Sequence, residues 1–138
     1  MLQTIEHLSN EEKVIFYNSL TAIQNRLDDL VPIFYNYFLQ TKAGELFKNL
    51  DIEKQYKMFH VSLAILISYI DYPYLLLEHL QLIIKNHKKY GVEKKHISLF
   101  VESFMLTLEE FIQNKHALKI WRTVITEIMQ TFQEQLES

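Results

Sequence analysis

The chain has 138 residues, a formal net charge of -3, no cysteine, two glycines and two prolines, and 49% of its residues are hydrophobic. This length suits one domain, which we place over residues 1–138, and the slightly acidic, dispersed charge excludes an electrostatic case for nucleic-acid binding. The lack of cysteine excludes disulfides and thiolate catalysis, and we expect a cytoplasmic protein with neither a signal peptide nor a membrane-spanning segment.

Hydrophobic periodicity predicts helices from one end of the chain to the other. Ser9 and Glu12 stand three residues apart, a capping-box spacing that opens a first helix. Its apolar side comprises Val14, Phe16, Tyr17, Leu20 and Ile23. A second helix over residues 28–40 carries Pro32 in its first turn, where the missing N–H is tolerated. Residues 41–50 are expected to be irregular.

Four further helices are predicted after this segment. Asp51 is a predicted N-cap, and the helix that it opens has the most regular apolar stripe of the chain. That stripe is Ile52, Tyr56, Phe59, Leu63, Leu66 and Ile70. Asp71-Tyr72-Pro73 then breaks this helix, a shorter helix follows, and two long helices with inward stripes close the chain. We therefore expect an all-α protein of six or seven helices around one apolar pocket.

The shorter helix places a histidine on its predicted inward face. Leu76, Leu80, Ile83 and His87 recur at spacings of 4, 3 and 4, which is one face of a helix. Gly91 follows as the predicted left-handed stop. An inward histidine is a candidate ligand, although such a side chain by itself more often belongs to an ordinary core.

Several of these residues together resemble those of a known family. Residues 87–92 are similar to the proximal-histidine turn of bacterial single-domain globins and flavohaemoglobins. Gln55 stands 32 residues before the histidine, where that family has a distal glutamine. The pair Phe34-Tyr35 and the later Phe47 match its pocket residues, so the resemblance implies a globin-like fold.

The same resemblance implies a haem site. His87 would be the axial ligand of the iron, and Tyr35 and Gln55 would donate hydrogen bonds to bound oxygen or nitric oxide. Phe47 and Phe59 would be the walls of the pocket. Tyr35 and Gln55 also have a plain structural interpretation as interface and rim residues.

Three departures from the family pattern argue against this chemistry. Ile97 stands ten residues after the histidine, where flavohaemoglobins have a tyrosine that tunes the iron. The Val-Gly pair of the family is Phe100-Val101, and Phe59 replaces a smaller Leu or Val. The lost tyrosine argues against a nitric oxide dioxygenase, and the added bulk argues against a full haem, because protein interiors have little spare volume.

A second branch of the family accommodates these departures. The chain resembles the haem-free globin sensor domains of sporulation kinases in bacilli, and this resemblance implies an apolar pocket that holds a fatty acid. The interval from Tyr35 to Phe47 is also shorter than in the family, so Ile33 is the alternative distal residue. The candidate pocket residues are His87, Tyr35, Phe34, Phe38, Phe47, Gln55, Phe59, Leu63, Leu80, Ile84, Tyr90, Ile97, Phe100, Val101 and Phe104.

Three functions therefore stand as hypotheses. The favoured one is a non-enzymatic sensor that binds a fatty acid without a cofactor, and the alternative is a globin that binds haem b through His87. The third is a purely structural interaction module. No nucleophile with an adjacent base and no paired carboxylates point to an enzyme, and His60, His79 and His96 lack zinc-ligand spacing.

The sequence also suggests partners. Lys85, Lys88 and Lys89 form a cationic flank that could hold a carboxylate, although lysines at a helix end are more often merely solvated. The favoured branch implies a sensor kinase as a possible partner. Apolar residues outside the main stripes of the last two helices predict a homodimer through those helices; they are Met105, Leu106, Ile120, Ile125 and Met129.

Overall fold

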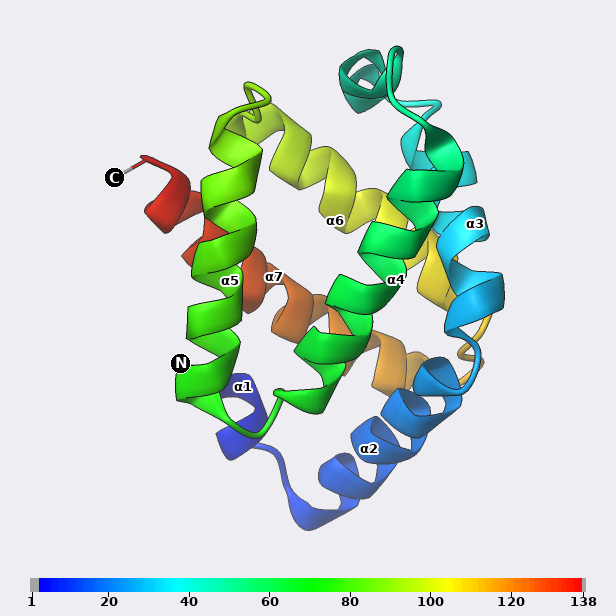
Figure 1. Ribbon diagram of the computed structural model, residues 1–138. Helices are drawn as coiled ribbons and strands as arrows, with labels where there is room; N and C mark the ends of the chain where they lie inside the picture. The colour runs from blue at the N-terminus through cyan, green and yellow to red at the C-terminus, as the bar shows by residue number, and fades with distance from the viewer. Residues whose placement is uncertain (1–2, 138) are drawn as a thin grey trace.

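The computed structural model describes residues 3–137, which form seven α-helices and one 3₁₀ helix (Figure 1). In chain order they are α1 (Gln3–Glu6), α2 (Asn10–Gln24), α3 (Leu27–Phe38), the 3₁₀ helix η1 (Lys42–Phe47), α4 (Ile52–Ser68), α5 (Pro73–Lys88), α6 (Lys94–Glu109) and α7 (Lys115–Glu137). The described part of the chain has no strand, so the all-α prediction is confirmed. None of its helices combines the length and the apolar content needed to cross a bilayer.

The predicted helix boundaries are mostly confirmed because the capping residues work as expected. The Oγ of Ser9 accepts the N–H of Glu12 at 3.1 Å, while the Glu12 carboxylate accepts the N–H of Ser9 at 3.0 Å. Asp51 caps α4 through the N–H groups of its first turn. Pro73 is the first residue of α5, and Gly91 has a φ of 72°, the left-handed conformation expected just after this helix.

Two details of the first half differ from the expectation. Pro32 lies in the second turn of α3, not the first, and it is exposed, so the carbonyl that loses its helical partner faces solvent. Residues 42–47, which were expected to be irregular, form a 3₁₀ helix. A Cβ atom at Gly44 would lie 2.2 Å from the carbonyl oxygen of Leu39. Any side chain at position 44 would collide with this backbone, so the glycine lets η1 turn back closely over the end of α3.

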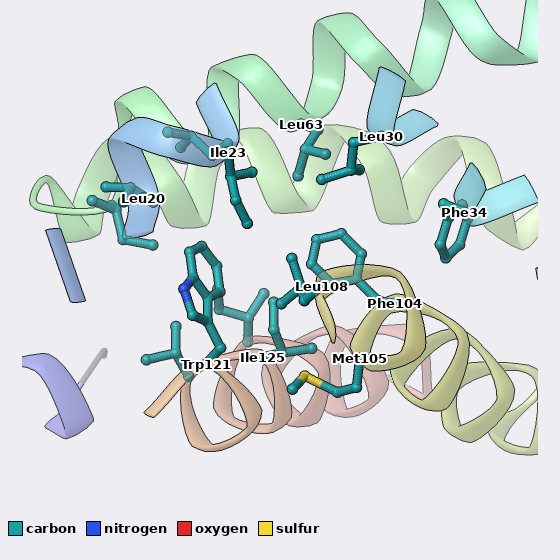
Figure 2. Close-up of a cluster of buried hydrophobic side chains, with 14 of the residues drawn as sticks. Leu20, Ile23, Leu30, Phe34, Leu63, Phe104, Met105, Leu108, Trp121 and Ile125 are labelled. Carbon is teal, nitrogen blue, oxygen red and sulfur yellow. The ribbon is translucent and has the colours of Figure 1, made fainter. Parts of the chain in front are cut away.

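The helices lie in two layers, and the last helix, which belongs to one of them, contacts α5 of the other. α3 packs against α4 and α6, while α7 contacts α1, α2, α5 and α6. In Figure 1, α4 and α5 cross in front of α6 and α7. Figure 2 shows the resulting core, with Trp121 and Ile125 of α7 on one side and Phe34 of α3 and Leu63 of α4 on the other.

The residues predicted to face inward are buried or half-buried in most helices. In the last two helices, more residues are buried than the sequence predicted. Val14 is 62% exposed and does not belong to the apolar side of α2. Met105, Ile120 and Ile125, which we expected on an outer face, are buried in the core of the chain itself. They are buried because α6 and α7 are each packed on more than one side. Of the five residues predicted to pair with a second copy, only Leu106 is exposed, and Met129 is half-buried.

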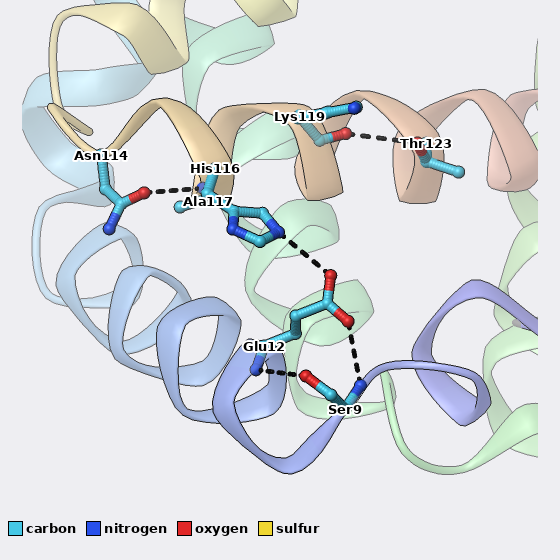
Figure 3. Close-up of polar contacts among 7 residues, drawn as sticks. All are labelled: Ser9, Glu12, Asn114, His116, Ala117, Lys119 and Thr123. Atoms are coloured by element: carbon cyan, nitrogen blue, oxygen red, sulfur yellow. Dashed lines mark hydrogen bonds and ion pairs between the residues drawn. The ribbon is translucent and has the colours of Figure 1, made fainter.

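A polar contact ties the start of α2 to the start of α7 (Figure 3). The hydrogen bond from the N–H of Ser9, and then the hydrogen bond from His116 at 3.0 Å, lower the pKa of the Glu12 carboxyl below its ordinary value of 4.5. The unfolded chain therefore takes up this proton first as the pH falls. The stabilisation by Glu12 is complete above the ordinary pKa and is lost as the pH falls through the lower folded-state pKa.

We expect Glu12→Gln to destabilise the protein at neutral pH and to lose this effect in acid. Urea unfolding of wild type and variant at a series of pH values between about 7 and 3 measures the difference. Glu11→Gln is the matched control, because it removes a first-turn carboxylate that makes neither hydrogen bond. A Glu12→Gln difference that stays constant down to the acid end would contradict the prediction.

Candidate functional site

Five phenylalanine rings meet at the centre of the predicted pocket; we call Phe34, Phe38, Phe59, Phe100 and Phe104 the ring cluster. They come from α3, α4 and α6, and their contacting pairs have centroids 4.8 to 6.1 Å apart. Phe34 touches all four of the others and is 1% exposed. Because aromatic rings at these distances attract one another and exclude water, the side chains that we expected to line a pocket fill it themselves.

Three more rings extend this arrangement toward α4 and η1. The ring of Tyr35 lies 5.3 Å from that of Tyr56, 5.9 Å from that of Phe47 and 5.7 Å from that of Phe59. Burial, and next the nearby phenol of Tyr56, raise the pKa of Tyr35, which therefore stays protonated and able to donate at neutral pH. Tyr35 thus joins Phe34 of the same helix in contact with Phe59, while Ile33 is half-buried.

His87 does not lie on the buried face of its helix, contrary to the sequence prediction. The buried stripe of α5 is Leu76, Leu80 and Ile84, whereas His87 is exposed. The ring of His87 packs edge-on against that of Phe132 on α7, with the ring centroids 5.7 Å apart.

The tautomer of His87 follows from one hydrogen bond. Its Nδ1 lies 2.7 Å from the carbonyl oxygen of Ile83, which can only accept, so in the neutral ring Nδ1 carries the hydrogen. The Nε2 lone pair is then free to bind another group. That orientation suits a metal-binding imidazole, although the side chain lies outside the ring cluster.

The remaining predicted pocket residues divide into two groups. Leu63, Leu80, Ile84 and Ile97 are buried, and Gln55 and Val101 are half-buried. Tyr90 follows the end of α5 and is 61% exposed, so it does not line the interior. The structure thus brings the aromatic candidates of α3, η1, α4 and α6 together and leaves His87 and Tyr90 outside the buried core.

Two surface hollows stand out on residues 3–137. One, of about 230 Å³, lies against α5 and α7 and is lined by Gln81, Ile84, Lys85, Lys88 and Gln135. The other, of about 300 Å³, lies beside α2 and the turn before α7. No ring of the cluster borders either hollow, so the lysines of the predicted cationic flank and the aromatic candidates do not share one cavity.

A haem would have to lie between His87 and the residues around Tyr35. Neither hollow lies there, the rings of Phe34 and Phe59 pack on each other at 4.8 Å and both contact Tyr35, and His87 directs its ring at Phe132. As arranged, these side chains do not fit a haem. Within the described residues, no group of three or more His, Cys, Asp or Glu side chains could hold a free metal ion either.

Two histidines outside the predicted site, His79 and His96, have environments that distinguish them. The Nε2 of His79 on α5 lies 3.3 Å from the Oγ of Ser62 on α4, and burial lowers the pKa of His79. His96 on α6 is 5% exposed, and its Nε2 has no hydrogen-bond partner among the described residues. The sequence spacing of both histidines had been weighed only against that of zinc ligands. The sequence feature that indicates a buried His96 is its place three residues after Glu93, beside the inward Ile97.

The arrangement defines an all-helical ligand-binding fold of the kind that the proximal-histidine turn predicts. A family model described as Globin matches residues 31–132, and the chain belongs to the globin family. No curated protein matches the chain. The predicted globin-like fold is therefore confirmed.

Proposed function

We propose that this globin is a non-enzymatic sensor that binds an apolar carboxylic acid, such as a fatty acid, without haem. The ring cluster carries the proposal: five phenylalanines interlock beside Tyr35, the residue that would face a ligand bound to a haem. Phe59 and Phe100 are only half-buried, so an apolar chain can enter by displacing these two rings and can recover their burial with its own surface. The sensor would act in signalling by sequestering its ligand or by pairing with a sporulation sensor kinase.

Haem binding is the second candidate function, and one observation favours it. The hydrogen bond from His87 to Ile83 leaves the Nε2 of the neutral imidazole available as a metal ligand. The position of Phe132 and the filled interior speak against this candidate.

An absorption spectrum before and after incubation with haemin and desalting separates the two candidates. We expect no stable Soret band, and we expect organic extraction followed by mass spectrometry to recover an apolar acid from the purified protein. A sharp Soret band that His87→Ala abolishes would overturn the haem-free proposal and establish the second candidate.

Two phenylalanine variants test the place of binding. Phe100→Val opens the half-buried edge of the ring cluster, so we expect it to change the amount of extracted acid. Phe111→Val is the matched control, because this half-buried ring follows α6 and packs under Arg26 at 4.8 Å, away from the cluster. Equal retention by both variants would count against binding at the cluster.

Self-association through α6 and α7 is also part of the proposal. Among the residues named for it, exposed Leu106 and half-buried Met129 would have to carry the contact. Sedimentation at micromolar concentration tests it, and a monomer would overturn it.

A further inference from the structure

The buried polar side chains of residues 3–137 all belong to one helix. They are His96, Ser103 and Thr107 of α6, which are 5%, 2% and 0% exposed. Their spacings of seven and four residues place them on one face of the helix. Phe100 shares that face, and its ring contacts Phe34 and Phe38 of α3. A polar stripe therefore runs beside the ring cluster.

His96 has a hydrogen-bond donor that nothing in the described chain satisfies. Its Nδ1 accepts the backbone N–H of Glu93 at 2.8 Å, so the hydrogen of the neutral imidazole must be on Nε2. That Nε2–H is buried and unpartnered. By contrast, the hydroxyl of Thr107 donates to the carbonyl oxygen of Ser103 at 2.8 Å. Because an unsatisfied buried donor is costly, an acceptor from outside the chain would stabilise this site.

The surroundings of His96 favour an acceptor that is negatively charged. It lies in the first turn of α6, a helix of 16 residues whose N-terminal N–H groups carry partial positive charge. Lys94 and Lys95 precede it in the sequence, and the carboxylate of Glu93, which caps the backbone N–H of His96, is also paired with Lys95 at 3.5 Å. The apolar neighbours on the same helix are Ile97 and Phe100.

We infer that the Nε2–H of His96 binds the carboxylate of an apolar carboxylic acid whose hydrocarbon chain packs against Phe100. The inference rests on the proposed function and adds the residue that recognises the polar end of the ligand. It gives this role to α6, whereas the lysines of α5 border a separate hollow in which no ring of the cluster takes part.

Calorimetric titration with decanoic acid tests the inference on four proteins: wild type, His96→Phe, His96→Gln and His60→Phe. We expect His96→Phe to bind about tenfold more weakly or worse, as the loss of one hydrogen bond to a charged group predicts. His96→Gln keeps an N–H donor and should recover part of the affinity. His60→Phe is the control, because this half-exposed histidine of α4 pairs with Asp28 at 3.3 Å and has no place in the polar stripe of α6.

A second measurement does not depend on whether His96→Phe folds. In protein labelled with ¹⁵N-histidine, decanoate should shift the Nε2 resonance of His96 and slow the exchange of its hydrogen. Binding with equal affinity to all four proteins and an unchanged His96 resonance would overturn the inference while leaving the proposed function intact. A wild-type protein that binds no decanoate would overturn both.

Discussion

Phe34→Ala is expected to lower the free energy of unfolding by about 3–5 kcal/mol, which is a large part of the stability of a domain of this size. Phe34 is 1% exposed and its ring contacts those of five residues on three helices: Tyr35, Phe38, Phe59, Phe100 and Phe104. Truncation removes these contacts and leaves a cavity that rigid neighbouring rings cannot close. Urea unfolding followed by circular dichroism measures the loss.

Two further variants make this result interpretable. Phe34→Leu retains much of the volume and should cost clearly less than the alanine variant, so it remains measurable if Phe34→Ala does not fold. Tyr74→Ala removes a ring that is 90% exposed and should change stability by no more than about 0.5 kcal/mol. A Phe34→Ala variant as stable as Tyr74→Ala would mean that the ring cluster is not packed as described.

Trp121→Ala should cost a similar amount, about 3–5 kcal/mol, at the other side of the core. Trp121 is the only tryptophan of the chain, lies 4.9 Å from the ring of Phe16, and donates its indole N–H to the Oγ of Ser19 at 2.8 Å. It therefore joins α7 to α2 by both packing and a hydrogen bond. Far-ultraviolet circular dichroism is the probe, since the substitution removes the tryptophan fluorescence.

The two components of this contact can be separated. Trp121→Phe keeps an aromatic ring but loses the donor, while Ser19 still donates to the carbonyl oxygen of Phe16, so this variant should lose less than Trp121→Ala. Ser19→Ala leaves the indole N–H without its partner and should cost about 1–3 kcal/mol. If the Ser19→Ala effect is the same in the Trp121→Phe background, the hydrogen bond contributes nothing.

The sequence was most informative where a single residue determines local geometry. The Ser9 and Glu12 box, Asp51, Pro73 and Gly91 each set a helix boundary through hydrogen bonds or a fixed backbone angle, and each was predicted correctly. The periodicity of apolar residues located the helices but did not show which helices pack against one another. Met105, Ile120 and Ile125 are buried because their helices are packed on several sides, which the spacing of apolar residues cannot specify.

The site was predicted less well than the fold, for a related reason. The spacing of Ile83 and His87 correctly places them on the same face of a helix. Which face of α5 is buried, however, depends on how this helix packs against α7. The aromatic candidates could be named from α3, α4 and α6 because several helices place rings toward the same space. Their interlocking, and the unpaired Nε2 of His96, depend on tertiary packing that no motif encodes.

The contacts of α7 bear on how the chain folds during synthesis. α1, α2, α5 and α6 all pack on this helix, which the ribosome makes after each of them. α6 can already pack on α3, but until Trp121 and Val124 emerge the faces of those four helices that belong against α7 stay uncovered. Native packing must therefore wait for nearly all of this sequence, and the emerging chain exposes Phe16 and Leu76 to chaperones in the meantime.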